Sequence, residues 1–317
     1  MKKTLILIVA LIIATTTSHA QQATATLNHN DTLTTFYGID AFKDACAKAK
    51  YGDVISLSHG QFTGPTINAG VTVIGSGMDA DTTNNIMPTI ILNETTLNAG
   101  GTFKNITFEE IKIYCDRISI EFERCRIKDV SAYSSSIEAY WTLYNCIANV
   151  GFTHDIKAIN SYIFGDTYFT TSDYFKEGYF ENCIIEEYDI ERSLLINCIV
   201  IDNYGNTKNG FHCIDVYLTN TLIVTNDTNP FSGCNVSKAW VTGSGTKLFK
   251  DNSKYYELTN EIKNKYKGID GKELGIYGGA HTFSHKPMTH HITKCEVAPK
   301  TTPDGKLSVH IEVSGQE

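Results

Sequence analysis

Arginine is scarce in this sequence: only four of its 317 residues are arginine, namely Arg117, Arg124, Arg126 and Arg192. Bidentate recognition of carboxylate groups favours arginine over lysine, so the chain has little with which to clamp anionic sugars. The formal net charge of -8 becomes -10 when two lysines are removed with the N-terminal leader described next. An acidic surface of this kind argues against nucleic acid as a partner.

Long apolar runs are also missing, apart from one at the start of the chain. Two lysines precede an apolar run from Leu5 to Ala14, and Ser18-His19-Ala20 offers a small-residue cleavage site. This pattern predicts a secretory signal peptide over residues 1–20 and not a membrane anchor. No later run is long enough to span a bilayer. We therefore expect a secreted mature chain without a transmembrane segment, located in the periplasm, at the cell surface or outside the cell.

A short motif recurs between residues 125 and 236. Each copy has a small anchor residue, usually preceded by Asn and followed by aliphatic residues, and the anchors are Cys125, Cys146, Ser161, Cys183, Cys198, Thr221 and Cys234. Successive anchors lie 21, 15, 22, 15, 23 and 13 residues apart. These steps are shorter than the roughly 30 residues of a strand–helix–strand unit. They fit the coils of a solenoid whose rungs stack in parallel.

The alternation of side chains along a strand fixes which residues face the interior. If the anchor and the residue two positions later point inward, the interior is lined with small and aliphatic residues, whereas the opposite phase would bury Arg126 and Lys128. The Asn before the anchor suits a bend, because Asn tolerates left-handed backbone. Aligned Asn residues can also form a hydrogen-bonded ladder between coils.

The nine cysteines of a secreted chain raise the question of disulfides. Their number is odd and five of them are anchors, which favours buried free thiols that behave as small hydrophobic residues. The alternative is one or two bridges between adjacent anchors, Cys125 with Cys146 or Cys183 with Cys198. The anchor spacing matches no zinc motif.

The remaining segments complete the domain organisation. Residues 21–37 are polar and predict a loose lead-in, and apolar residues at helical spacing predict a helix over residues 38–50 that caps the stack. The solenoid is expected over 38–249. The C-terminal extension, residues 250–317, contains a possible short helix within 255–267 and two alternating segments, Ile292–Ala298 and Lys306–Val313, around Pro303-Asp304-Gly305. These two segments predict a β-hairpin.

Residues 45–77 carry a more specific pattern. There a helix leads into Gly52-Asp53-Val54-Ile55-Ser56-Leu57, a Gly60-Gln61-Phe62 turn and Val71-Thr72-Val73-Ile74-Gly75. This order resembles the opening of secreted right-handed parallel β-helix proteins of the pectate-lyase-like superfamily, and Gly268–Gly279 resembles the end of such proteins in Bacteroidetes-type bacteria. The resemblance implies an all-β, single-stranded, right-handed parallel β-helix. It says less about activity, because one fold hosts many functions.

Enzymes of that superfamily include lyases that hold Ca²⁺ with carboxylates and use an Arg or Lys base. The best match here is Glu186, Glu187, Asp189, Glu191 and Arg192. On a strand, Glu187, Asp189 and Glu191 would share one face, and their oxygens suit Ca²⁺. The alternative is that these side chains form a solvated acidic edge of a rung and bind no ion. Apart from Ca²⁺ at this cluster, we expect no bound cofactor. Polygalacturonase-type enzymes share the sequence motifs N-T-D, a pair of Asp residues, G-H-G and R-I-K, in that order. This chain lacks that series of motifs. The histidines at 281, 285, 290 and 291 match no closed zinc site.

The residues between the inward positions form the outer face of the rungs. They are largely aliphatic in the later coils and include Tyr162 and Phe164, so they predict an apolar stripe that something covers. The chain's own C-terminal extension, including the hairpin, is one candidate cover, and a partner or glycan contacting Tyr162 and Phe164 is the other. We expect a non-catalytic secreted or cell-envelope protein that binds glycan or a protein partner. The alternative is a polysaccharide lyase or glycoside hydrolase.

Overall fold

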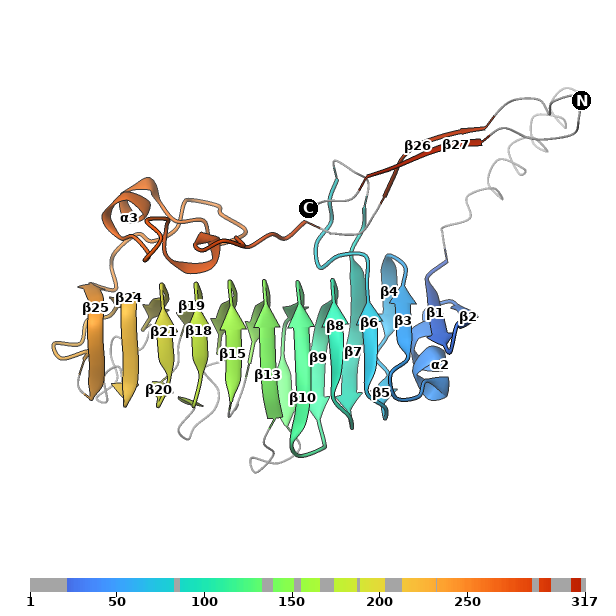
Figure 1. The fold of residues 1–317 in the computed structure, drawn as a ribbon, viewed down its shortest axis with the longest axis horizontal. Helices are drawn as coiled ribbons and strands as arrows, with labels where there is room; N and C mark the ends of the chain where they lie inside the picture. Colours follow the sequence, from blue (N-terminus) through green and yellow to red (C-terminus); the bar gives the residue numbers. More distant parts are fainter. Residues whose placement is uncertain are drawn as a thin grey trace, which may run out of the picture.

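The computed structural model describes residues 22–82, 86–132, 139–150, 155–165, 174–186, 189–202, 213–231, 233–286, 291–297 and 309–314. The chain is a parallel β-solenoid of about eight turns, seen side-on in Figure 1. The repeat therefore predicted the fold class correctly. The signal peptide expected over 1–20 lies outside the described residues and stays a prediction.

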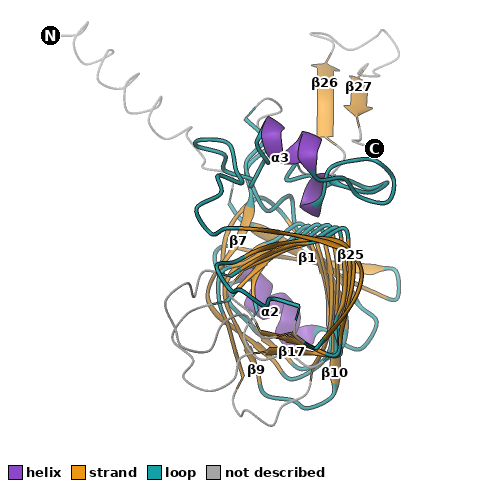
Figure 2. Ribbon diagram, turned by 90° about the vertical axis from the view of Figure 1, so that its left-hand side faces the viewer, coloured by secondary structure: helices purple, strands orange, loops and turns teal. Residues whose placement is uncertain are grey.

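Three faces surround the core (Figure 2). The first, which we call the open face, consists of β3 (Val54–Leu57), β6 (Val71–Ile74), β8 (Gly101–Lys104), β10 (Ile118–Glu123), β13 (Ala139–Tyr144), β15 (Ile156–Ile159), β18 (Tyr179–Glu181), β21 (Leu194–Ile196) and the first parts of β24 (Val216–Val224) and β25 (Cys234–Thr242). Each strand pairs in parallel with the equivalent strand of the next coil.

The second, which we call the covered face, consists of β4 (Gly60–Thr63), the first parts of β7 (Thr89–Leu97) and β9 (Thr107–Ile113), β11 (Arg126–Ile127), β14 (Ile147–Asn149), β16 (Tyr162–Phe164), β19 (Ile184–Glu186), β22 (Ile199–Ile201) and the second parts of β24 and β25. The third face contains β5 (Thr66–Ile67), the ends of β7 and β9, and β12 (Val130–Ala132), followed by a separate sheet of β17 (Tyr174–Lys176), β20 (Asp189–Glu191) and β23 (Cys213–Ile214).

The predicted strand phase is confirmed by the burial of the inward positions. The anchors from residue 125 to 221 and the residues two positions after them are all fully buried. Small anchors fit because equivalent residues of stacked strands lie only about 4.8 Å apart. The anchor groups also donate hydrogen bonds to main-chain carbonyls of the preceding coil, as Cys125 Sγ does to Phe103 O at 3.3 Å and Cys146 Sγ to Phe122 O at 3.4 Å.

Left-handed backbone marks the corner before each anchor. The φ angles of the asparagines there lie between 47° and 59°, at Asn105, Asn145, Asn160, Asn182, Asn197 and Asn220. Asn is suited to this conformation because its short polar side chain tolerates positive φ better than most side chains do. The predicted ladder forms where Asn197 Nδ2 donates to Asn182 Oδ1 at 3.2 Å.

The N-terminal end differs from the expected lead-in and cap. The segment expected to be loose contains β1 (Thr24–His29) and β2 (Thr32–Tyr37), an antiparallel pair in which β1 also pairs with β3. The helix α2 (Ala41–Lys48) buries Phe42 and Ala45 against the core. The structure does not confirm a helical cap as such, because strand β1 and not the helix hydrogen-bonds the edge of the first coil. These two strands were not predicted because the segment is rich in Thr and Asn and was therefore interpreted as a loose lead-in.

Residues 243–286 leave the solenoid and fold back over the covered face, a segment that we call the cover (Figure 1). It contains α3 (Asn260–Lys265), whose N-cap residue Thr259 accepts a hydrogen bond from Ile262 N, and the 3₁₀ helix η1 (Gly275–Tyr277). The predicted hairpin is confirmed as β26 (His291–Val297) and β27 (Val309–Ser314), and it stands away from the stack. None of the helices in the described ranges is long and apolar enough to cross a membrane.

Thiol reactivity provides a test of the core. The seven cysteines whose side chains are described are free, and burial raises the pKa of Cys46 and Cys146 to about 12. We expect at least seven thiols to react with a thiol reagent in denaturant, whereas Cys125, Cys146, Cys183 and Cys198 will not react in the native protein at pH 8. Fewer than seven in denaturant would mean that disulfides form.

Candidate functional site

The predicted acidic cluster does not come together in the described residues. Glu186 lies on the covered face, where its carboxylate accepts a hydrogen bond from the Tyr162 hydroxyl. Glu191 lies at the end of β20, on the third face. The next residue, Arg192, pairs with Glu177, with 3.5 Å between Nη2 and Oε1 and both side chains more than half exposed. An ion pair this exposed contributes little to stability or to a binding site.

The described residues do not test the Ca²⁺ hypothesis. Glu187 lies outside the described residues, and the backbone alone is described for Asp189. No group of three His, Cys, Asp or Glu side chains in the described part of the chain is placed to hold a metal ion. Ca²⁺ binding at these carboxylates therefore stays a prediction.

Tyr162 and Phe164, the predicted ligand contacts, lie under the cover. The ring of Tyr162 is buried and stacks on Tyr256, with 3.6 Å between ring centroids and 11° between planes. Around it, Ile184, Ile199 and Leu222 are fully buried in one cluster with side chains of the cover, including Leu258, Ile262, Leu274, Ile276 and Phe283. The apolar stripe thus exists, and the chain's own segment covers it. Tyr162 is therefore buried in the described chain, and a role for Tyr162 and Phe164 as ligand contacts stays a prediction.

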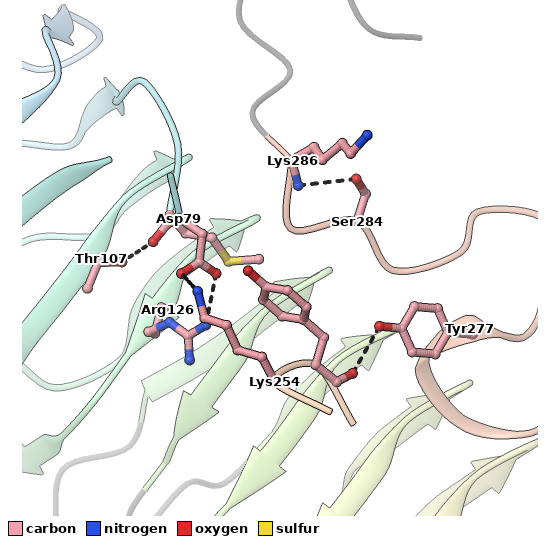
Figure 3. Close-up of polar contacts among 9 residues, drawn as sticks. Asp79, Thr107, Arg126, Lys254, Tyr277, Ser284 and Lys286 are labelled. Atoms are coloured by element: carbon pink, nitrogen blue, oxygen red, sulfur yellow. Dashed lines mark hydrogen bonds and ion pairs between the residues drawn. The ribbon is translucent and has the colours of Figure 1, made fainter. Parts of the chain in front are cut away.

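A polar junction holds one edge of the cover (Figure 3). The nearly buried carboxylate of Asp79 accepts from Arg126 Nη2 at 2.9 Å and from Lys254 Nζ at 3.0 Å. Asp79 belongs to the polar insertion after β6, Arg126 to β11 and Lys254 to the cover. Thr107 Oγ1 donates to Met78 O at 2.7 Å and holds the insertion against β9. The junction therefore ties together three segments that are far apart in the sequence.

Aromatic groups complete this junction. The rings of Tyr255 and His285 stack with centroids 3.7 Å apart, and the Tyr277 hydroxyl donates to Tyr255 O at 2.9 Å. Burial lowers the pKa of His285, so its ring is neutral at neutral pH. Because both partners of Asp79 are cations, its carboxylate is held as a structural ion-pair acceptor and is poorly suited to act as a general base. The position of His285, one of the histidines at 281, 285, 290 and 291, is thus explained by its stacking on Tyr255.

An open groove of about 570 Å³ lies across the starts of β6, β8 and β10 on the open face. Its polar lining consists of Tyr51, Thr72, Thr102, Arg117, Ser119 and Glu121. Tyr51 is 90% exposed, which is unusual for a large aromatic side chain. A ring this exposed is available for stacking.

Glycines shape the floor of this groove. A Cβ at Gly100 would lie 2.3 Å from Ser119 O, and a Cβ at Gly70 would lie 3.0 Å from the Tyr51 ring. The lack of side chains therefore lets neighbouring coils approach and lets Tyr51 lie beside bare backbone. Strand register then aligns Thr72, Thr102 and Glu121 across three consecutive coils. Each coil contributes one polar side chain to a row, with a repeat of about 4.8 Å.

These groove residues were not singled out from the sequence. The alternation of inward and outward positions indicates that Thr72, Thr102 and Glu121 point outward, but it does not reveal which outward face stays uncovered. That depends on where residues 243–286 fold back. The exposed Tyr51 follows α2 in a turn, where no periodicity marks it.

Comparison with known proteins adds no relative to this description. No protein-family model, no curated protein and no solved structure matches the chain. The fold therefore defines the class, a parallel β-solenoid, and the groove and its residues are the basis for an argument about function.

Proposed function

We propose that this protein is a secreted or cell-envelope β-solenoid that binds glycan in the groove beside Tyr51 without chemically changing it. The exposed Tyr51 ring carries this proposal because it lines the same groove as a row of hydroxyl and carboxylate groups. Sugars present an apolar ring face and a polar rim of hydroxyls. Aromatic side chains suit the first and hydrogen-bonding side chains suit the second. The resemblance of residues 45–77 to the pectate-lyase-like superfamily, together with that of Gly268–Gly279 to the end of such proteins in Bacteroidetes-type bacteria, supports an extracellular glycan as the ligand.

The charge of the groove favours an uncharged glycan. Arg117 is the single cation and Glu121 the single carboxylate among its lining residues, so the two charges balance. Clamping an acidic sugar needs an excess of arginine or lysine. Neutral oligosaccharides should therefore bind more tightly than oligosaccharides of uronic acids.

The same lining favours binding over catalysis. Glycoside hydrolysis normally uses two carboxyl groups about 5 to 9.5 Å apart, and this groove offers one. A lyase or hydrolase remains the alternative function, because Arg117, Glu121 and Tyr51 are groups that an enzyme of this fold class can use. Product formation distinguishes the two functions.

Calorimetry on the mature chain with neutral oligosaccharides and with oligogalacturonides tests the proposal. We expect Tyr51→Ala to weaken binding of a neutral oligosaccharide about tenfold, which corresponds to the loss of about 1.4 kcal/mol of stacking. Because Tyr51 is 90% exposed, the variant should fold normally. Tyr217→Ala is the matched control, since Tyr217 is exposed on the same face in a later coil.

The outcomes separate the functions. If no oligosaccharide binds, or if both tyrosine variants bind like the wild type, the groove is not a glycan site. New reducing ends or unsaturated products from the wild type that disappear in Glu121→Gln would establish the enzyme instead.

A further inference from the structure

The core of the solenoid is uncovered at its C-terminal end. Val236 and Val241 of the last strand, β25, align with Leu218 and Ile223 of β24, which are 1% and 0% exposed. Val236 and Val241 are themselves 43% and 42% exposed. They occupy inward positions of the repeat, but no further coil in the described residues packs on them. Figure 2 views the coil from this end, and the helix seen through the coil, α2, lies at the opposite end of the molecule beside β1 and β2 (Figure 1).

The backbone of β25 is open as well. In the described part of the chain β25 pairs with β24 alone. Thr225 N donates to Thr242 O at 2.9 Å, so the main-chain groups of Thr242 point toward β24. Alternation then directs those of Ala239 and Val241 toward the open edge.

In the open-face part of β25, Asp215 N donates to Gly233 O at 2.8 Å and Cys234 N donates to Phe231 O at 3.0 Å. Alternation from Gly233 directs the main-chain groups of Val236 toward the same open edge. Strand edges of this kind, with unpaired backbone and apolar side chains, readily pair with another chain.

The opposite end of the solenoid also has an open edge strand. There β2 pairs with β1 alone among the described strands, at the other extreme of the long axis from β25 (Figure 1). Leu33, Tyr37 and Ile39, on or beside this strand, are 67%, 65% and 51% exposed. The two ends of the molecule therefore each combine an apolar surface with unpaired backbone.

The directions of these two strands match. β1 is antiparallel to both β2 and β3, so β2 runs in the same direction as β3. Parallel pairing from coil to coil carries that direction to β25. Five residues of β25, Cys234–Lys238, belong to the open face, and β2 has six residues. If the two strands paired, the sheet of the open face would continue from one molecule into the next.

We propose that copies of this chain associate head to tail, with β25 of one copy pairing in parallel with β2 of the next. The charges fit this arrangement: the one charged residue of β25 is the exposed Lys238, and β2 is uncharged with the exposed carboxylates of Asp31 and Asp40 on either side. The contact joins two different surfaces, so it does not close into a ring of two and instead yields linear assemblies. This inference does not depend on glycan binding.

A two-fold dimer through β25 fits less well. Antiparallel pairing of two copies of Cys234–Thr242 about their central residue would set Lys238 opposite Lys238 of the second copy. Like charges directly opposite each other destabilise a strand pair. Head-to-tail pairing avoids this contact.

Two variants, each altered at one end, test the proposal. Val236→Lys/Val241→Lys alters the C-terminal end, and Leu33→Lys/Tyr37→Lys alters the N-terminal end. All four side chains are at least 42% exposed, so both proteins should retain the circular dichroism of the wild type. Light scattering should show a wild-type mass that grows with concentration, and each variant alone should have the mass of one copy. A 1:1 mixture should yield a mass of two copies, because one intact end of each kind remains.

Control proteins distinguish head-to-tail pairing from the other contacts that could cover the open ends, namely a two-fold contact through β25 and the hairpin. Tyr140→Lys, an exposed position on β13 in the middle of the solenoid, should assemble like the wild type. A wild type with the mass of one copy at every concentration would overturn the proposal, as would a mixture that does not pair. Dimers formed by the N-terminal variant alone would show the two-fold contact instead. Loss of assembly on deletion of residues 287–317 would show that the hairpin is the occupant.

Discussion

Removing residues 250–317 is expected to turn the protein into one that binds hydrophobic dye and aggregates, while the solenoid keeps its β-sheet signal. The cover shields Ile184, Ile199 and Leu222, which are all 0% exposed. Each fully buried side chain of this size contributes roughly 1.5–3 kcal/mol relative to an exposed one. A bare stripe of aliphatic residues along several coils is a surface that soluble proteins seldom leave open. Dye fluorescence and light scattering measure the effect.

A second truncation is the matched control. Deleting residues 287–317 removes the hairpin and keeps the cover, whose last buried apolar side chain is Phe283. This protein should bind no more dye than the full chain. If both truncations bind dye equally, the hairpin contributes to covering the stripe. If neither does, the contacts between the cover and the stripe are not formed in solution.

The strand phase was predictable because it depends on residues within one coil. Small anchors such as Cys146 and Ser161 fit where coils stack, and burying Arg126 would have been costly. The corner conformation was predictable for the same reason, since Asn tolerates left-handed backbone locally. The apolar stripe on the outer face could be predicted from the strand phase. That something covers the stripe could be predicted because soluble proteins seldom expose a large apolar surface.

What the sequence left open depends on contacts between distant segments. The ion pairs of Asp79 with Arg126 and Lys254 span 47 and 175 residues, and no local pattern indicates which cations meet a given carboxylate. The same holds for the groove, which is open only because the cover folds onto a different face. β1 and β2 were missed because their polar sequence lacks the apolar alternation of a half-buried strand. Tyr162 was expected in the covered stripe, but no local pattern indicated that Tyr256 is the side chain that stacks on it.

Replacing Asn160 with alanine is expected to lower the free energy of unfolding by about 3 kcal/mol. The Asn160 side chain is buried, and its Nδ2 donates to Ile276 O at 3.0 Å and to Gly278 O at 2.9 Å. Each such bond contributes about 1 kcal/mol. Its φ of 48° adds about 1 kcal/mol against alanine, which tolerates left-handed backbone less well. Urea denaturation of the variant and the wild type measures the loss.

Two further variants separate the bonds from the backbone. Asn160→Gly keeps the left-handed corner available and removes only the bonds to the cover, so it should lose about 2 kcal/mol. Asn145→Ala changes a corner with a φ of 54° whose side-chain oxygen has no hydrogen-bond partner, and it should lose about 1 kcal/mol. Asn160→Gly should also increase dye binding, because the cover loses an attachment to the stripe. Equal losses for Asn160→Ala and Asn145→Ala, with unchanged dye binding, would mean that the asparagines shape the corners and do not hold the cover.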